Sequence, residues 1–191
     1  MGKVVVSEFV SLDGVIEDPG GAEGTDFGGW TFRFPAPDGQ QFKLEELRAA
    51  DVQLLGRVTY EEFAAAWPAM KETTGEFGVM MNEMPKVVVS TTLTEPAWEN
   101  TTVVAGDLPG AVAALKSRYD GDILVAGSAT LVGALRDHDL VDEYRLMLHP
   151  VVLGRGKRLF GAGAAPADLA LVSSRSVGPD VLLLTYRPAG R

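Results

Sequence analysis

Short runs of β-branched residues alternate along this chain with segments of helical period, and this alternation restricts the fold more than any other feature. The expected strands are Lys3 to Phe9, Val52 to Leu55, Lys86 to Ser90, Thr101 to Val104 and Asp122 to Ala126. Most are too uniformly apolar for a sheet with one face in water, which predicts central and mainly parallel strands. Residues with the spacing of one helix face lie between them: Tyr60, Phe63 and Trp67, then Val112, Leu115 and Tyr119, then Leu131 and Leu135. The pattern predicts an α/β sheet covered by helices.

The pattern changes after Asp139. Tyr144, Leu146 and Leu148 alternate with Glu143, Arg145 and Met147, and Val181 to Tyr186 forms another predicted strand. With Leu169 to Ser173 between them in the chain, these segments predict an antiparallel extension that closes one edge of the sheet. No break in composition is long enough to mark a second domain, so residues 1–191 are expected to form a single domain.

Composition excludes several classes of function. The chain has 191 residues, of which 46% are apolar, and a formal charge of -9, which is the profile of one soluble domain and opposes nucleic-acid binding. It has no cysteine and only two histidines, His138 and His149, so neither a disulfide framework nor a metal centre is expected. No apolar run approaches the length of a membrane span, and Glu8 interrupts any secretion signal, which predicts a cytoplasmic protein.

The segment from Asp18 to Gly39 is rich in glycine, proline and aromatic residues. A loop of this length is uncommon inside a compact domain and often acts as a lid, although a plain surface loop is equally compatible with the sequence. Trp30, Phe32 and Phe34 could cover an aromatic substrate; the alternative is a local hydrophobic plug or a subunit contact.

Three strand ends carry small or hydroxyl residues. Gly56, Arg57 and Thr59 follow one predicted strand, and Gly127, Ser128, Ala129 and Thr130 follow another. Each would place a helix N-terminus, with unpaired N–H groups and partial positive charge, where a phosphate can bind; an ordinary N-cap is the alternative. Ser90 and Thr91 follow a third strand, where they form either a turn or part of a ligand site.

These junctions also carry a resemblance to a known family. The segments Ser11 to Ile16, Leu55 to Glu61, Val125 to Ser128 and Pro150 to Gly156 together resemble the dihydrofolate reductase superfamily. They look most like its single-domain members related to the reductase domain of bacterial riboflavin biosynthesis. The resemblance spans nearly the whole chain. It implies a three-layer α/β/α fold with a mostly parallel central sheet and antiparallel C-terminal edge strands.

The resemblance implies an NADPH site. By analogy, Arg57, Ser90 and Thr91 would hold the adenosine 2′-phosphate, and the planar, permanently charged guanidinium suits that role. The helix starts at Gly56 and Thr59, and at Gly127, Ser128, Ala129 and Thr130, would receive the pyrophosphate. The segment with Leu12, Asp13, Gly14 and Ile16 would line the nicotinamide and substrate, with Trp30 as a further substrate contact.

No proton donor can be assigned from the sequence. Dihydrofolate reductases place a carboxylate on the first helix, but Glu45 and Glu46 are interpreted here as solvated positions of an amphipathic helix, which argues against folate reduction. Asp13 and Glu17 are the remaining candidates. Arg155, Lys157 and Arg158 form either a solvated basic turn or a contact for a substrate phosphate, and His149 is interpreted as a packed strand residue.

The sequence therefore predicts an NADPH-dependent reductase that acts on a small heterocyclic or carbonyl substrate. Dihydrofolate reductase is one alternative, and a non-catalytic NADP(H)-binding sensor or scaffold is another. Relatives are commonly dimeric, so a homodimer through the late antiparallel strands is expected.

Overall fold

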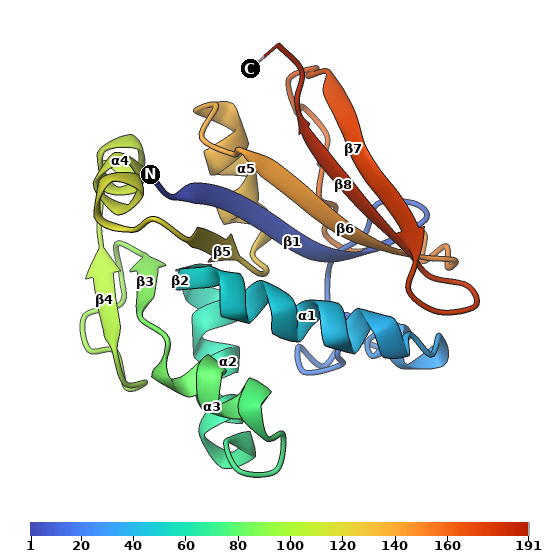
Figure 1. The fold of residues 1–191 in the computed structure, drawn as a ribbon, viewed down its shortest axis with the longest axis horizontal. Coiled ribbons are helices and arrows are strands. Elements are labelled where there is room, and N and C mark those ends of the chain that lie inside the picture. The colour runs from blue at the N-terminus through green and yellow to red at the C-terminus, as the bar shows by residue number, and fades with distance from the viewer. Residues whose placement is uncertain (191) are drawn as a thin grey trace.

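An eight-stranded sheet with helices on both faces organises residues 1–190, which are the residues described in the computed structural model (Figure 1). Arg191, the last residue of the predicted domain, lies outside them. The strands are β1 (Lys3–Ser11), β2 (Ala50–Gly56), β3 (Lys86–Val89), β4 (Thr101–Val104), β5 (Asp122–Val125), β6 (Glu143–His149), β7 (Leu169–Ser176) and β8 (Leu182–Pro188). The helices are a 3-10 turn η1 (Trp30–Arg33), α1 (Pro37–Ala49), α2 (Arg57–Met70), α3 (Glu76–Glu83), α4 (Leu108–Arg118) and α5 (Ala129–Asp137).

The strand order is β4-β3-β2-β5-β1-β6-β8-β7, and β1 to β6 all run parallel. The predicted central strands and the helices between them are confirmed. β7 and β8 form the expected antiparallel edge, since β8 pairs antiparallel with both β6 and β7. Among residues 1–190, no helix combines the length and the apolar character needed to cross a membrane.

The structure corrects one strand of the expected antiparallel extension. β6 pairs parallel with β1, from Val5 opposite Glu143 to Ser11 opposite His149, and is antiparallel only to β8. The alternating sequence of β6 led to the wrong prediction, because the face of the strand that carries Glu143 and Arg145 is not exposed to water. Tyr144 and Leu146 face one apolar cluster, while Glu143 is buried among other charges on the opposite face.

Apolar clusters cover both faces of the sheet. One contains Val112 and Leu115 of α4 with Leu131 and Leu135 of α5, all packed on the inner strands. The other contains Leu47, Tyr60 and Met81, which come from α1, α2 and α3. Because α1 begins next to the carboxyl ends of the strands and returns to the start of β2, its N-terminal end lies near that edge of the sheet (Figure 1).

A buried network of charges lies beneath α1. Arg145 of β6 contacts Glu143 at 2.7 Å, Asp122 at 2.9 Å and Glu46 at 3.4 Å. The interpretation of Glu46 as solvated was wrong, because its side chain is 1% exposed and accepts a hydrogen bond from Ser7 at 2.7 Å. Glu45 is exposed, as expected. The sequence pattern does not predict the burial of Glu46, because an amphipathic helix usually buries apolar residues. Here the buried position is occupied by a carboxylate that pairs with Arg145 of the sheet.

We expect Arg145→Met to destabilise the fold by about 3–5 kcal/mol, because it leaves three buried carboxylates without their shared cation. Urea denaturation at neutral pH measures this loss. Arg48→Met is the matched control: Arg48 pairs with Glu76 at the surface, with both side chains about half exposed, so its loss should cost no more than about 1 kcal/mol. Equal effects of the two substitutions would contradict the structural role of Arg145.

Candidate functional site

The carboxyl ends of β1 to β6 meet along one edge of the sheet, which we call the rim. This edge carries Ser11, Gly56, Val89, Val104, Val125 and His149, the last residues of these strands. Ligands of open α/β sheets bind outside the carboxyl ends of the strands, which directs attention to the loops and helix starts that follow them.

The first rim junction connects β2 directly to α2. Gly56 ends the strand and Arg57 begins the helix, without any intervening loop. A Cβ atom at Gly56 would lie 2.4 Å from Ser128 Oγ, so only glycine permits this contact. Thr59, in the first turn of α2, is buried. The start of α2 is therefore packed against the residue that precedes α5.

The second rim junction connects β5 to α5 and packs against the start of α2. Gly127 has a φ of 85°, and a Cβ atom there would lie 2.9 Å from Thr59 Cγ2. Ser128 also has a positive φ, 71°, which is uncommon outside glycine. Its hydroxyl accepts a hydrogen bond from the N–H of Leu131 at 3.3 Å, so it caps α5 as one reading of the sequence proposed.

Together the junctions place two helix N-termini side by side. α2 has no side-chain cap, and Ser128 satisfies one N–H group of α5. The other N–H groups of each first turn, including those of Ala129 and exposed Thr130, carry the partial positive charge of a helix start. Two such starts in contact form a surface suited to an anion with two phosphate groups.

The remaining predicted phosphate contacts flank this pair. β2 and β3 are in register with Gly56 opposite Val89, so Arg57 and Ser90 each directly follow one of two register partners. The Ser90 hydroxyl accepts hydrogen bonds from the N–H groups of Thr92 and Leu93, which forms a turn and leaves Thr91 exposed. Arg57 is partly exposed and pairs with Glu61 at 2.7 Å. Their contact with a ligand stays a prediction.

The loop after β1 is held to a late segment of the chain through Asp13. This carboxylate accepts hydrogen bonds from the Ser11 hydroxyl at 2.7 Å and from the N–H groups of Leu153 and Gly154, and it pairs with Arg158. The Ser11 hydroxyl, followed by those N–H groups, holds the pKa of Asp13 well below its usual range. Asp13 is therefore ionised at neutral pH, which suits a clamp and opposes a role as proton donor.

Two other positions of the same loop have open space around them. Leu12 is 58% exposed, and Gly14 has a φ of 83° with no atom near the position of a missing Cβ. Ile16 is buried and donates its N–H to the carbonyl of Lys157. Of the four predicted positions, Leu12 and Gly14 are thus the ones open to a ligand.

Ion pairs also account for Glu17 and the basic turn. Glu17 pairs with Lys157 at 2.6 Å, and this contact lowers the pKa of Glu17. Arg155 pairs with Asp26 at 2.8 Å. Arg158 pairs with Asp13. Each of the three cations of the basic turn, Arg155, Lys157 and Arg158, therefore has a carboxylate partner between Asp13 and Asp26. The arrangement favours a clamp between two loops over a site for a substrate phosphate.

The aromatic residues of the long loop lie in two environments. Trp30 is fully buried and donates its Nε1–H to the carbonyl of Glu17 at 2.9 Å. It meets His149 edge-on with ring centres 5.3 Å apart, and Phe34 approaches the same imidazole. Burial lowers the pKa of His149, and its packed position in β6 agrees with the sequence interpretation. Phe32 is 79% exposed. The structure favours a hydrophobic plug at Trp30 over a lid.

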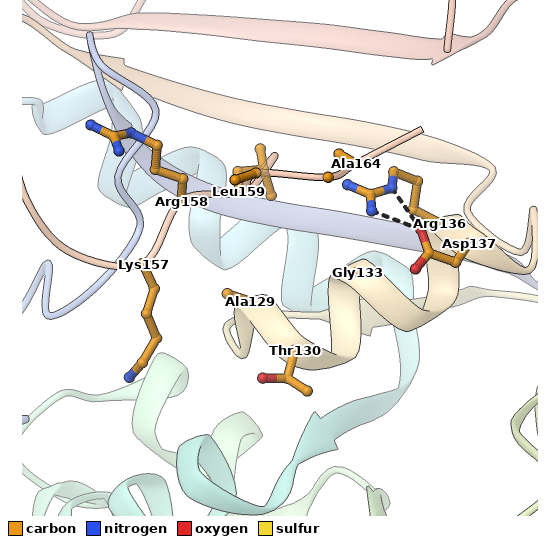
Figure 2. A pocket seen from close by; sticks show the side chains of 12 residues that line it. Ala129, Thr130, Gly133, Arg136, Asp137, Lys157, Arg158, Leu159 and Ala164 are labelled. Atoms are coloured by element: carbon orange, nitrogen blue, oxygen red, sulfur yellow. Dashed lines mark hydrogen bonds and ion pairs between the residues drawn. The ribbon is translucent and has the colours of Figure 1, made fainter. Parts of the chain in front are cut away.

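A cleft of about 350 Å³ continues from the first turn of α5 along residues 157–164 (Figure 2). Three cations line it, and each has a carboxylate partner: Arg136 with Asp137, Lys157 with Glu17, and Arg158 with Asp13. Figure 2 shows the cations at the two ends of the cleft and α5 along its side. Among residues 1–190, no group of three or more His, Asp or Glu side chains is placed to hold a metal ion.

Glu8 is a rim residue that sequence reasoning missed as a site candidate. It points to the α5 face of the sheet, is 5% exposed, and accepts the N–H of Gly127 at 2.9 Å. Burial raises the pKa of Glu8 to about 7, against the opposing effects of that N–H and of Lys43. The available signal was a single carboxylate inside the apolar run from Val4 to Val10, because glutamate is rarely buried without a partner.

The parallel sheet and the paired helix starts at its rim define an α/β protein with a candidate anion site at the carboxyl ends of its strands. Its family model is the RibD C-terminal domain, which matches residues 2–183. The chain belongs to this family, as the resemblance implied. Among proteins of Bacillus subtilis strain 168, YyaP is 29% identical over 187 residues, covering 96% of this chain and 94% of YyaP. YwjB is 26% identical and covers 95% of each chain.

Solved structures show the same fold. A Shewanella sp. PV-4 protein, whose name assigns it provisionally to riboflavin biosynthesis, has a TM-score of 0.75 at 23% identity and covers 98% of this chain and 99% of its own. The Thermotoga maritima diaminohydroxyphosphoribosylaminopyrimidine deaminase/5-amino-6-(5-phosphoribosylamino)uracil reductase has a TM-score of 0.67 at 17% identity, with 98% and 57% covered. Enterococcus faecalis dihydrofolate reductase, complexed with NADP(H), has a TM-score of 0.60 at 14% identity, with 98% and 97% covered. The predicted dihydrofolate reductase-like fold is confirmed.

The raised pKa of Glu8 predicts a pH-dependent stability. The folded chain holds a proton on Glu8 up to about pH 7, whereas the unfolded chain releases it near the ordinary value of 4.5. The associated stabilisation is complete below pH 4.5 and is lost as pH rises through 7. Relative to Glu8→Gln, the wild-type chain should therefore lose roughly 2 to 3 kcal/mol between pH 5 and pH 8. Urea denaturation of both chains at these two pH values measures the difference, and parallel stabilities would contradict the burial argument.

Proposed function

We propose that this protein is an NADPH-dependent reductase that transfers a hydride to a small heterocyclic or carbonyl substrate. The observation that carries the proposal is the mutual packing of the two rim junctions. Gly56 against Ser128, and Gly127 against Thr59, bring two helix starts together where a dinucleotide diphosphate would need N–H donors. Membership of the RibD C-terminal domain family supports the same reading.

Each predicted contact has a place in this proposal. Thr59, together with Gly127 and Ser128 before α5 and Ala129 and Thr130 at its start, would bind the diphosphate. Arg57, Ser90 and Thr91 would bind the 2′-phosphate, since they follow the register partners at the ends of β2 and β3. Charged hydrogen bonds from a guanidinium to phosphate are strong and directional, which fits Arg57 to the discrimination of NADPH from NADH.

The loop after β1 would place the reacting groups. When bound, the reduced nicotinamide supplies the hydride, and the protein supplies orientation and exclusion of water. The open backbone at Gly14 allows close approach of a ring, and Leu12 offers an exposed apolar side chain beside it. Asp13 would act by fixing this loop to Leu153 and Gly154. The proposal places the protein in the cytoplasm, where reduced dinucleotides are available.

The family supports one substrate class. The T. maritima neighbour is named for reduction of a phosphoribosylaminouracil, and a riboflavin-pathway type of heterocycle is our leading substrate class. Dihydrofolate is the alternative heterocycle, but Glu46 on α1 is locked by Lys43 and Arg145 and so lacks the freedom to bind a pterin.

A non-catalytic NADP(H) sensor is the second candidate. Asp13 and Glu17, the two candidate proton donors, favour this alternative, because ion pairs hold both side chains as carboxylates without a proton to donate. Oxidation of NADPH in the presence of a panel of aminopyrimidine, dihydrofolate, aldehyde and ketone substrates separates the two functions. Turnover with one of them supports the reductase, and nucleotide binding without any turnover supports the sensor.

Arg57→Ala should weaken NADPH binding by roughly 10- to 100-fold, because a hydrogen bond to a charged group contributes about 1.5 to 3 kcal/mol. NADH binding should change little, so the preference for NADPH should largely disappear. Tryptophan fluorescence titrations with both nucleotides measure this. Arg118→Ala on α4 is the control and should retain the preference. If Arg57→Ala lost NADH affinity to the same extent, Arg57 would not be the residue that recognises the 2′-phosphate.

We also propose a homodimer through the late antiparallel strands. β7 is an edge strand of the sheet, and Leu171 and Val172 on it are 56% and 49% exposed. Leu182 on β8 is also exposed. An edge with unpaired backbone groups and exposed apolar side chains is suited to pairing with a second copy.

If β7 forms the dimer contact, Val172→Lys should shift the protein from dimer to monomer, because two like charges would face each other across a symmetric interface. Size-exclusion chromatography with light scattering measures the molar mass. Met70→Lys, an exposed apolar position at the end of α2, is the control and should leave the mass unchanged. A monomeric wild-type chain would rule out this interface.

A further inference from the structure

Glu8 occupies an unusual position beside the proposed diphosphate site. Its side chain is more than nine-tenths buried, and its Oε1 accepts the N–H of Gly127 at the junction that leads into α5. That N–H is taken up by Glu8, and the N–H groups of Ala129 and Thr130, which come next along the same junction, are the donors that would face a bound phosphate. A carboxyl group of this chain and the phosphates of a ligand would therefore lie next to the same helix start.

The second oxygen of Glu8 is free to change its protonation. Among residues 1–190, no ion pair or further hydrogen bond engages Oε2. The residue as a whole is 5% exposed to solvent. A proton can consequently reach this atom without unfolding the core.

The charges around Glu8 leave its carboxylate poorly compensated. On its own face of the sheet, the neighbours from β5, β6 and α5 are apolar, as Val125, Leu146 and Leu131 illustrate. The charged groups that act on it, Lys43 and Glu46, come from α1 on the opposite face and oppose each other. Lys43 is already engaged by Glu46 at 3.0 Å and by Ser7.

From this geometry we propose that Glu8 is a positioning residue that takes up a proton from solvent when a dinucleotide diphosphate binds at the rim. The inference rests on the proposed function. The ionised carboxylate repels the phosphates, while the protonated form retains an oxygen that accepts the N–H of Gly127. Because burial already brings the pKa of Glu8 to about 7, a nearby anion raises it further and the group becomes protonated at physiological pH.

Calorimetry of NADPH and NADH binding at pH 8, in two buffers with different ionisation enthalpies, tests the proposal directly. The wild-type chain should take up a substantial fraction of one proton with either nucleotide. Affinity for NADH should fall by up to about tenfold for each pH unit above 7, since binding favours the protonated state. NADH is the decisive ligand because it lacks the 2′-phosphate, which titrates near pH 6 and would add its own slope.

Glu8→Gln is the matched variant, because it keeps an oxygen acceptor for Gly127 and cannot ionise. It should bind NADH with little pH dependence above 7 and without proton uptake. Glu83→Gln, the same substitution at an exposed carboxylate on α3 near the opposite edge of the sheet, should behave like the wild-type chain. A purely structural role of Glu8 would alter affinity without altering the pH profile.

The outcomes separate the two proposals. Binding by the wild-type chain without proton uptake, or an equal pH slope in Glu8→Gln, overturns the role of Glu8 and leaves the nucleotide site standing. Absence of binding by both nucleotides overturns the role of Glu8 together with the proposed function. Because proton uptake is measured on the wild-type chain itself, the result does not depend on folding of the variant.

Discussion

The close contact between the two rim junctions is the constraint on which the site depends. α2 and α5 can begin side by side only because Gly56 and Gly127 have no side chains, since a Cβ at either would overlap Ser128 or Thr59. This contact links two βα units that are far apart in the sequence but adjacent in the sheet through β2 and β5. The result is a pair of helix starts held in one fixed relation, and fixed donors bind an anion without a cost of rearrangement.

If the helix starts bind an anion, as we propose, an acidic chain must keep unpaired carboxylates away from them. The fold does so by engaging its carboxylates elsewhere. Asp13 and Glu17 hold the loop after β1 against the basic turn, and Glu46 and Glu143 are held by Arg145 beneath α1. Glu8 is buried beside the start of α5, where it accepts the N–H of Gly127, and burial raises its pKa to about 7. The same group therefore links stability to pH and, on our proposal, links ligand binding to proton uptake.

Sequence reasoning predicted the features that depend on local patterns. Uniformly apolar runs identified the parallel strands, and glycine or hydroxyl residues after them identified Gly56, Ser90 and Gly127 as rim positions. It failed where the decisive partner was distant in the chain. The alternation of β6 indicated an antiparallel strand, because nothing local reveals that Arg145 meets Glu46 of α1 and Asp122 of β5. Glu46 and Glu8 were missed for the same reason, and the burial of Trp30 depends on His149, which lies more than a hundred residues later.

The central claim is that the paired starts of α2 and α5 bind the diphosphate of a dinucleotide. A crystal structure of the protein with NADPH tests it most directly. The account predicts diphosphate oxygens within hydrogen-bond distance of backbone N–H groups in the first turns of both helices, including Thr59 and Ala129. A nucleotide bound away from both helix starts, or a rim closed by the protein's own side chains, would contradict it.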